Sequence, residues 1–375
     1  MTPARRDRYL PLAAFMLATA LALPSLRQPA PPRVRLSVIQ PALANAPAGM
    51  ERRFLPNPAP SAHSVTLCDL GKGNIAAAWF AGSREGAADV NIVFATFDGK
   101  VWSPARPIVT REQLQHDVQR LVRKLGNPVL WRDAKGVLHL WFVSVGYGGW
   151  AGSAINHMQS DDDGATWSTA RRLITSPFLN ISTLVHGAPL ALEDGGVALP
   201  VYHEFIAKRP EWLRLDARQR VIDKVRLPAS THELQPAAAA FDDHDILALL
   251  RDAGPTHRIH ASHSADGGAH WTDATTTVLP NPNAGIALLR LADGRLLLAS
   301  NPEETDRNLL ALQVSSDRGK TWSAPRFIER GSSDEEYSYP ALLQDETGMI
   351  HLAYTWQRKK ICHIRFAPAT LDELE

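Results

Sequence analysis

Two arginines at the ends of strand-like segments have side chains that are suited to binding an acidic ligand. Arg251 follows the apolar run at residues 246–250, and Arg307 follows the polar segment at residues 301–306. Because the guanidinium group is planar and stays charged, it binds a carboxylate through two parallel hydrogen bonds. Each arginine could instead form a salt bridge at the surface. Their type alone leaves both interpretations open.

Three further residues bear groups that nucleophilic or acid–base chemistry requires, namely Asp89, Glu233 and Tyr337. A phenol has a pKa of about 10, so a tyrosine attacks at neutral pH only with a base such as a carboxylate beside it. Asp89 lies at the end of a charged loop, where it could simply begin the next strand. Glu233 could be an ordinary loop carboxylate, and the neighbouring Tyr339 could pack within a strand.

A repeated turn indicates the elements that position these residues. The pattern S-x-D-x-G-x-x-W, here called the Asp-box, occurs at residues 160–167, 264–271 and 315–322. In such a turn Asp bonds backbone amides, Gly supplies positive φ and Trp packs on an apolar layer. The boxes that begin at Ser264 and Ser315 are 51 residues apart. A period near fifty with only strand and turn signals predicts a β-propeller of about four strands per blade.

A second repeated feature, a Gly- or Asp-bearing turn followed by an apolar strand, counts the blades. It occurs six times, at residues 71–78, 133–142, 194–201, 242–250, 293–299 and 346–353. We therefore predict an all-β fold, a six-bladed propeller over residues 50–370. Residues 34–39 alternate apolar with polar side chains and could close the ring by pairing with the last blade. Residues 112–125 form the one convincing helix signal.

Polar and aromatic residues at the strand ends of this propeller suit sugar binding, although they also occur as ordinary rim residues. They are Tyr147, Trp150, His157, His186, His203 and Glu204. Cys68 and Cys362 lie in the first and last repeats, where a disulfide is conceivable, but buried free thiols are the commoner outcome. No Cys/His spacing suggests zinc, and we expect neither a metal nor a cofactor.

The N-terminus differs from the remainder of the chain. Three arginines within residues 1–8 precede the uncharged, largely apolar residues 9–26. This pattern predicts a signal peptide or an N-terminal membrane anchor over residues 1–26, with a disordered tail as the third alternative. Residues 27–49 would be a linker containing the candidate closing strand. The propeller is then exported: periplasmic, secreted or attached to a membrane. The net charge of +1 gives no reason to expect a nucleic-acid partner.

The Asp-boxes and six blades resemble the sialidase (neuraminidase) superfamily. Residues 79–89 look like the family loop that delivers the catalytic aspartate, residues 232–236 resemble its N-E-P-Q segment, and Tyr337-Ser338 resembles the string that carries its tyrosine nucleophile. The resemblance implies that Tyr337 attacks, Glu233 polarises it and Asp89 is the acid/base. It also implies that Arg251 and Arg307 are two members of an arginine triad that binds the substrate carboxylate.

The chain departs from the family at one local pair. His63 stands where the first triad arginine is expected, and Thr355 stands where the glutamate that supports this arginine is expected. Because both losses fall on one pair, they indicate a changed subsite. Such a site could still bind sialic acid or could bind another acidic sugar, and His63 would make binding depend on pH.

The sequence therefore predicts an exo-glycosidase of the sialidase type that hydrolyses a terminal acidic sugar with retention, its partner being an acidic glycan. The alternatives are a glycosidase or lyase for a uronate-type glycan that uses His63, and a non-catalytic carbohydrate-binding propeller. The expected catalytic residues are Asp89, Glu233 and Tyr337. The expected substrate-binding residues are His63, Arg84, Arg251, Arg307, Tyr147 and His203, and we expect the site to lie at one end of the central channel.

Overall fold

The computed structural model describes residues 15–17, 31–36, 49–176 and 180–372. The chain divides into two compact units, Met1–Pro31 and Pro32–Glu375, and the propeller is the second unit. Most of the predicted signal peptide or anchor lies outside the described residues. Within the described residues, no helix is long and apolar enough to cross a membrane.

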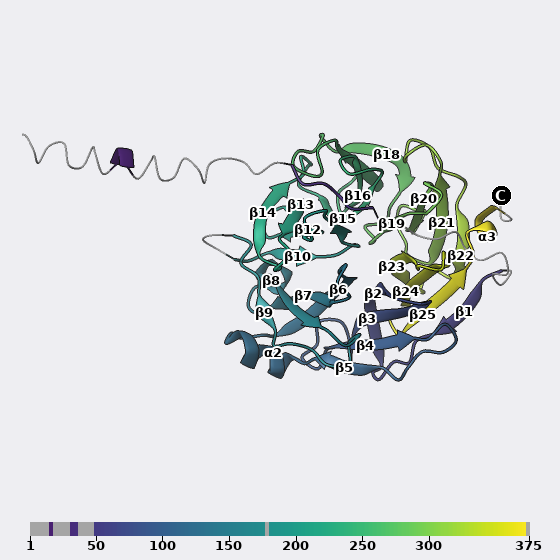
Figure 1. Ribbon diagram of the computed structural model, residues 1–375. Helices are drawn as coiled ribbons and strands as arrows, with labels where there is room; N and C mark the ends of the chain where they lie inside the picture. Colours follow the sequence, from purple (N-terminus) through teal and green to yellow (C-terminus); the bar gives the residue numbers. More distant parts are fainter. Residues whose placement is uncertain (1–14, 18–30, 37–48, 177–179, 373–375) are drawn as a thin grey trace, which may run out of the picture. The chain divides into compact units, whose positions relative to one another are not determined.

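Antiparallel sheets surround a central channel as six blades, which confirms the predicted fold class (Figure 1). Blade 1 comprises β2 (Ser61–Gly71), β3 (Asn74–Gly82), β4 (Asn91–Phe97) and β5 (Arg106–Val109). Blade 2 comprises β6 (Lys124–Arg132), β7 (Leu138–Val145), β8 (Ser153–Ser160) and β9 (Arg171–Arg172). Blade 3 comprises β10 (Thr183–Val185), β11 (Leu190–Ala191), β12 (Val197–Glu204), β13 (Lys208–Leu215) and β14 (Val221–Arg226). In each blade the innermost strand comes first in the sequence, and in blade 3 it is divided into β10 and β11.

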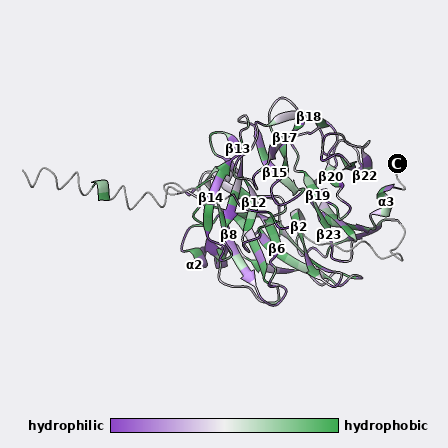
Figure 2. Ribbon diagram, turned by 45° about the horizontal axis from the view of Figure 1, so that its top comes forward, coloured by the Kyte–Doolittle hydropathy of each residue, from purple (hydrophilic) through white to green (hydrophobic). Residues whose placement is uncertain are grey.

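The other three blades repeat this four-stranded order. Blade 4 comprises β15 (Glu233–Ala240), β16 (Ile246–Asp252), β17 (Arg258–Ser264) and β18 (Thr275–Pro280). Blade 5 comprises β19 (Ala287–Arg290), β20 (Leu296–Ser300), β21 (Leu309–Ser315) and β22 (Arg326–Arg330). Blade 6 comprises β23 (Tyr337–Gln344), β24 (Ile350–Trp356), β25 (Lys360–Phe366) and β1 (Glu51–Phe54). Each of the six predicted hairpins contains the turn before the second strand of a blade. Hydrophobic residues concentrate in the strands, as Figure 2 shows.

The ring closes through β1, whose residues Glu51–Phe54 pair with β25 from Arg365 back to Cys362. The prediction that residues 34–39 close the ring was therefore wrong. Within its described part, Val34 forms a bridge with Leu192 of blade 3 and donates its backbone N–H to Asp243 O (2.8 Å). Alternating side chains indicate an extended segment, but they do not say which edge of the propeller this segment meets.

The predicted helix at residues 112–125 is shorter and begins one residue earlier, as α2 (Arg111–Val118). The Oγ1 of Thr110 caps its N-terminus by accepting a hydrogen bond from the Gln113 backbone (3.2 Å), and Gln119 ends it in the left-handed conformation with φ of 50°. The chain beyond Gln119 enters β6. Two further short helices of the propeller unit are η2 (Gly149–Gly152) and α3 (Ala369–Asp372).

The three Asp-boxes connect the third and fourth strands of blades 2, 4 and 5. In the box of blade 5, Ser315 Oγ accepts a hydrogen bond from the Gly319 backbone and Asp317 Oδ1 accepts one from the Thr321 backbone, both at 2.9 Å. The tryptophans of two boxes pack on the preceding blade: the ring of Trp271 lies 5.2 Å from that of Trp212, and the ring of Trp167 lies 5.7 Å from that of Phe94. These boxes therefore fasten consecutive blades to one another.

Four of the innermost strands bulge near their first residues. The residues Ser64, Asn127, Gln235 and Tyr339 have φ between 43° and 55°, and the strand register shifts at each of them. A bulge redirects side chains, and the end of the channel where these residues lie is called the mouth. Below the mouth, apolar residues of all six blades line the channel, namely Leu67, Leu130, Ala188, Ala237, Leu288 and Leu342.

Candidate active site

Arg251 lies at the mouth and holds three polar neighbours. Its Nη1 donates to Gln235 Oε1 (2.7 Å) and to the Tyr339 hydroxyl (3.0 Å), while its Nε donates to Asn283 Oδ1 (2.8 Å). Its strand, β16, brings it to this position from blade 4. A guanidinium that donates to a phenol oxygen favours negative charge developing on that oxygen during a reaction.

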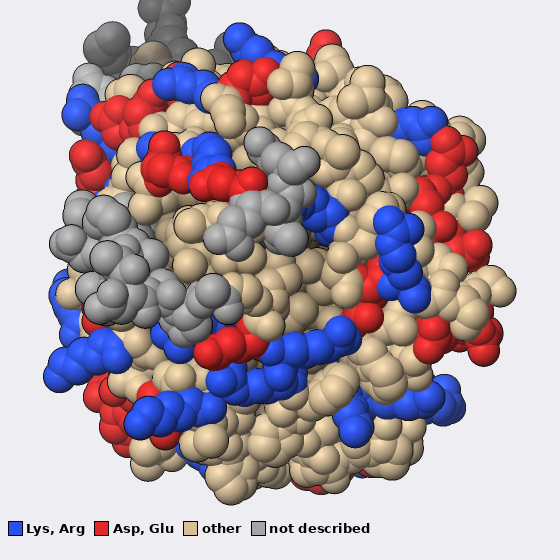
Figure 3. Space-filling view, turned by 90° about the vertical axis from the view of Figure 1, so that its right-hand side faces the viewer, with Lys and Arg blue, Asp and Glu red and all other residues tan. Residues whose placement is uncertain are grey.

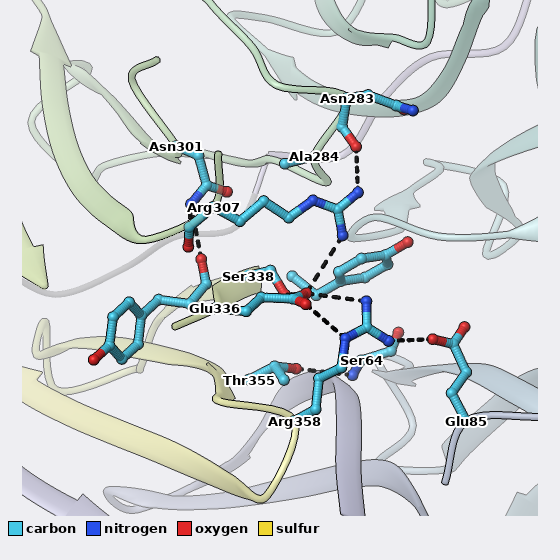
Figure 4. Close-up of polar contacts among 12 residues, drawn as sticks. Ser64, Glu85, Asn283, Ala284, Asn301, Arg307, Glu336, Ser338, Thr355 and Arg358 are labelled. Atoms are coloured by element: carbon cyan, nitrogen blue, oxygen red, sulfur yellow. Dashed lines mark hydrogen bonds and ion pairs between the residues drawn. The ribbon is translucent and has the colours of Figure 1, made fainter. Parts of the chain in front are cut away.

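Arg307 and Arg358 converge on the carboxylate of Glu336 from opposite sides (Figure 4). Arg358 donates from Nε to Glu336 Oε2 (2.6 Å) and from Nη2 to Oε1 (3.1 Å), and Arg307 Nη1 lies 3.3 Å from Oε1. Burial alone would raise the pKa of Glu336. Hydrogen bonds from Arg358 and Ser338, with the charges of Arg358 and Arg307, instead hold this pKa at about 2, so Glu336 is a carboxylate at neutral pH.

Two buried histidines flank the ring of Tyr339. Its centroid lies 4.4 Å from that of His63 and 5.4 Å from that of His186. Burial, followed by the charge of Arg358, lowers the pKa of His63 well below its usual value; burial and Arg251 lower the pKa of His186 to about 4. Both imidazoles are therefore neutral at neutral pH. Among the described residues, neither ring nitrogen of His63 has a hydrogen-bond partner, and neither does Nε2 of His186.

Amide side chains complete the wall of the mouth. The Tyr202 hydroxyl accepts hydrogen bonds from Asn127 Nδ2 (3.1 Å) and Gln235 Nε2 (3.2 Å). Burial raises the pKa of Tyr202, which makes it a poor nucleophile. Gln235 thus bridges Tyr202 to Arg251, and one hydrogen-bonded network joins blades 2, 3, 4 and 6 at the mouth.

A family model for a BNR repeat-like domain matches residues 73–352, which is most of the chain. The chain belongs to this BNR repeat-like family. No curated protein matches it significantly.

Solved sialidases share the fold of this BNR repeat-like protein. A Hadza microbial sialidase is 16% identical with a TM-score of 0.69, and the match covers 83% of this chain and 66% of that one. A leech intramolecular trans-sialidase solved with 2,7-anhydro-Neu5Ac is 15% identical with a TM-score of 0.67, and the match covers 84% of this chain and 69% of that one. The NanB sialidase of Streptococcus pneumoniae is 12% identical with a TM-score of 0.66, and the match covers 89% of this chain and 71% of that one. The chain spans about two thirds of the length of these proteins. At such identities the likeness establishes a sialidase-superfamily fold.

Tyr337, the expected nucleophile, does not face the channel. Its ring is 5% exposed and belongs to the hydrophobic core that blade 6 shares with blade 5, near Trp356. Tyr339, two residues later, contacts Arg251 and His63 instead. The prediction for Tyr337 is corrected accordingly: the bulge after Ser338 turns the second tyrosine of this BNR repeat-like protein toward the mouth.

Glu233, the expected polarising base, is also directed elsewhere. Its carboxylate accepts a hydrogen bond from Ser230 Oγ (2.6 Å) and lies 3.2 Å from Nδ1 of His260 on β17. It is 2% exposed, and its hydrogen-bond and ion-pair partners among the described residues are Ser230 and His260, not Tyr337 or Tyr339. The carboxamide of Gln235 takes the position beside Arg251 at the mouth, so the assignment of Glu233 as base to a tyrosine is corrected.

Asp89 lies on the exposed loop that joins β3 to β4. Its carboxylate accepts hydrogen bonds from Ser83 N and Ser83 Oγ, both at 2.9 Å, and these bonds lower its pKa. Glu85 of the same loop forms an ion pair with Arg358. Arg84 is exposed beside it. The loop is therefore linked to the mouth through Glu85, while Asp89 is occupied by its own loop.

The remaining predicted binding residues divide into two groups. His63 lies in the mouth, packed beneath Tyr339. Tyr147 is 73% exposed and lines a separate groove with Arg111 and Arg123 near α2. His203 is half-buried on β12, opposite Thr183. Within the described part of the chain, neither Tyr147 nor His203 forms a hydrogen bond or ring contact with Arg251, Arg307 or Tyr339.

Of the other rim candidates, His186 lies among the mouth residues, and Glu204 interacts electrostatically with Arg251. His157 is buried in blade 2, where its Nε2 lies 3.0 Å from Nδ1 of His139. Trp150 packs over Gly126 beside the core of blades 2 and 3. Glu204 is half-buried at the end of β12, and burial raises its pKa.

Sequence reasoning did not assign several residues of this mouth, among them Asn127, Gln235, Glu336, Tyr339 and Arg358. A usable signal was present for three of them. Asn127, Gln235 and Tyr339 each precede a proline at the start of an innermost strand. Such a recurrent X-Pro pair marks bulges that face one channel. Arg358 lies in a tight turn between strands, where no pattern distinguishes it from a surface residue.

Proposed function

We propose that this protein is a glycoside hydrolase of the sialidase type that releases a terminal acidic sugar at the mouth of the propeller. The observation that carries the proposal is the gathering of Arg251, Arg307 and Arg358, from three consecutive blades, around Glu336 and Tyr339. A planar guanidinium binds a carboxylate better than any other side chain does. The sialidase-superfamily fold and the BNR repeat-like family support a glycosidase-type function.

Tyr339 is the proposed nucleophile. Its oxygen would form a bond to the anomeric carbon while the bond from this carbon to the leaving oxygen breaks, and the hydroxyl proton would pass to a water molecule at the open mouth. Arg251 Nη1, at 3.0 Å, would stabilise the negative charge that develops on the tyrosine oxygen. A water molecule would then displace the tyrosine, so the anomeric configuration is retained. Near the carboxylate of the substrate, a neutral phenol meets less repulsion than an anionic nucleophile would.

Asp89 is the proposed acid and later base, and this role requires its loop to rearrange. In the structure, the two hydrogen bonds from Ser83 favour the charged form of the Asp89 carboxyl group. A carboxylate cannot donate a proton, so Asp89 must leave Ser83 and take up a proton from solvent before it can protonate the leaving oxygen. The loop contains Gly86 with φ of 73°, a conformation that glycine adopts without strain.

The test is hydrolysis of a fluorogenic sialoside by the wild-type protein and by two matched variants. Tyr339→Phe should lower kcat by about a thousandfold or more, because it removes the attacking oxygen. Tyr337→Phe should keep kcat within about threefold, since its ring remains in the core. Full activity of Tyr339→Phe, or loss of activity only in Tyr337→Phe, would remove Tyr339 from the mechanism.

A second function deserves a test because of His63. Its neutral imidazole lies against Tyr339 with both ring nitrogens unpartnered among the described residues, and a neutral imidazole can accept a proton. A glycosidase or lyase for a uronate-type glycan would use it in this way. Release of unsaturated uronate from acidic polysaccharides, lost in His63→Ala, would favour this function over sialoside hydrolysis. Glycan binding without turnover by any variant would favour a binding propeller.

A further inference from the structure

The mouth contains an arginine–glutamate pair close to the position where the sequence lacks one. His63 and Thr355 occupy the places at which a sialidase-type arginine and its supporting glutamate are expected. The backbone carbonyl of Arg358 accepts a hydrogen bond from the N–H of Ala62 (3.1 Å), so Arg358 is anchored one residue from His63. Thr355 Oγ1 accepts one from the Ser64 backbone (3.2 Å) on the other side of His63.

The side chain of Arg358 is both held and accessible. Glu336 binds its Nε and Nη2, and Glu85 pairs with its Nη1, as Figure 4 shows. Yet 38% of this side chain remains exposed, compared with 22% for that of Arg307. The backbone of Arg358 has φ of 53°, in the left-handed region. An arginine oriented by two hydrogen bonds and still open to solvent is prepared for an anionic ligand.

We propose that Arg358 is the third carboxylate-binding arginine of this site, supplied by blade 6 in place of the residue that blade 1 lacks. Glu336 is its supporting glutamate. Because Glu85 lies on the loop that carries Asp89, the Glu85–Arg358 ion pair also couples binding of the substrate carboxylate to the position of that loop. A ligand carboxylate that takes Arg358 Nη1 displaces Glu85 and releases the loop. This assignment rests on the proposed function.

Calorimetry with two probes of one shape tests it: 2,3-didehydro-2-deoxy-N-acetylneuraminic acid, which carries the carboxylate, and its methyl ester, which carries no charge. Arg358→Gln should weaken binding of the acid about tenfold or more, the range for a charge-assisted hydrogen bond. Binding of the ester should change less than about twofold. Lys359→Gln removes a charge from the same turn and is the matched control, with affinity for the acid unchanged.

Glu85→Gln separates the two parts of the proposal. The variant keeps the Arg358–Glu336 ion pair, so affinity for the acid should be retained or should rise. The kcat on a fluorogenic sialoside should change, because the loop has lost its ion pair with Arg358. Equal weakening of acid and ester by Arg358→Gln would show a structural role only and would overturn the assignment. So would an unchanged affinity for the acid, or a Glu85→Gln variant that binds the acid as weakly as Arg358→Gln does.

The two proposals fail in distinguishable ways. If the wild-type protein neither binds the acid nor hydrolyses a sialoside, the proposed function fails, and the role of Arg358 fails with it. If the wild type binds the acid and Arg358→Gln binds it equally well, only the role of Arg358 fails. Thermal unfolding of each variant, compared with wild type, verifies that the affinities refer to folded protein.

Discussion

Glu336 keeps its negative charge at the mouth because its neighbours outweigh the cost of its burial. The pKa of the folded-state carboxyl is about 2, whereas its ordinary value is 4.5. A group whose pKa is lowered by folding stabilises the folded state above its ordinary pKa, and this contribution disappears as the pH falls toward the lowered value. Glu336 should therefore stabilise the protein at neutral pH and progressively less between about pH 5 and pH 2.

Glu336→Gln should accordingly lower the free energy of unfolding by about 2 kcal/mol at pH 7, because Arg307 and Arg358 lose their shared carboxylate. The difference between the variant and wild type should shrink by more than half when the pH is lowered to about 3. Urea unfolding at a series of pH values measures it. A difference that is constant with pH would mean that the variant acts through packing and not through the charge of Glu336.

The sequence predicted which kinds of side chain gather at the mouth better than it predicted which members of neighbouring pairs point there. Arg251 and Arg307 lie at the mouth, as their position before the Asp-boxes indicated. The family resemblance implied roles for Tyr337 and Glu233, but in both segments a later residue, Tyr339 or Gln235, faces the channel. Side chains alternate in a strand, so one bulge reverses which of them point inward. The resemblance alone did not locate that bulge.

At the scale of elements, the repeated turns were the most predictable features. The hydrogen bonds of the turn S-x-D-x-G-x-x-W can be predicted from the pattern itself, because its Ser and Asp side chains accept hydrogen bonds from backbone N–H groups within the same eight residues. Local patterns of this kind need no tertiary information. The end of α2 was predicted less well, because residues 121–125 are compatible with either a helix or the entry to β6, and packing decides between them.

The glycine of the Asp-box is also a contact between blades. A Cβ added at Gly268 would lie 2.4 Å from Nε1 of Trp212, which is fully buried in blade 3. Gly294 has nearly the same φ, 92° against 89°, but an added Cβ would have no neighbour closer than 3.9 Å. The two positions therefore share the cost of a left-handed backbone and differ in packing.

Gly268→Ala should lower the free energy of unfolding by about 2 to 4 kcal/mol, combining left-handed strain with overpacking against Trp212. Gly294→Ala should lower it by about 1 kcal/mol, from strain alone. Chemical denaturation of both variants gives the comparison. Equal losses would show that the box glycine serves the turn only and that Trp212 yields to a methyl group without cost.

At the scale of the whole molecule, the six blades were predictable because a local sequence pattern marks each hairpin. The strand that closes the ring was not predictable. The decisive pairing joins Glu51 to Arg365 across almost the entire chain. The strand β1 is short, and its residues are Glu, Arg, Arg and Phe, of which the last is 42% exposed. Lys and Arg lie among Asp and Glu over this side of the molecule, as Figure 3 shows. No apolar alternation marks such a strand from its sequence.

Because the ring closes through β1, the last blade should depend on residues far from it in sequence. A chain that begins at Gly49 keeps β1, and a chain that begins at Pro56 lacks both β1 and Leu55, which is 2% exposed and contributes to the core of blade 1.

Loss of Leu55 alone should lower the free energy of unfolding by about 2 kcal/mol. Loss of β1 also leaves β25 as an open edge, which invites association between molecules. Both chains lack Val34, so they are compared with each other: the shorter chain should unfold at a midpoint lower by about 10 °C or more than the longer one, and it should aggregate on heating. Scanning calorimetry with light scattering measures both effects, and equal midpoints for the two chains would show that β25 does not require β1.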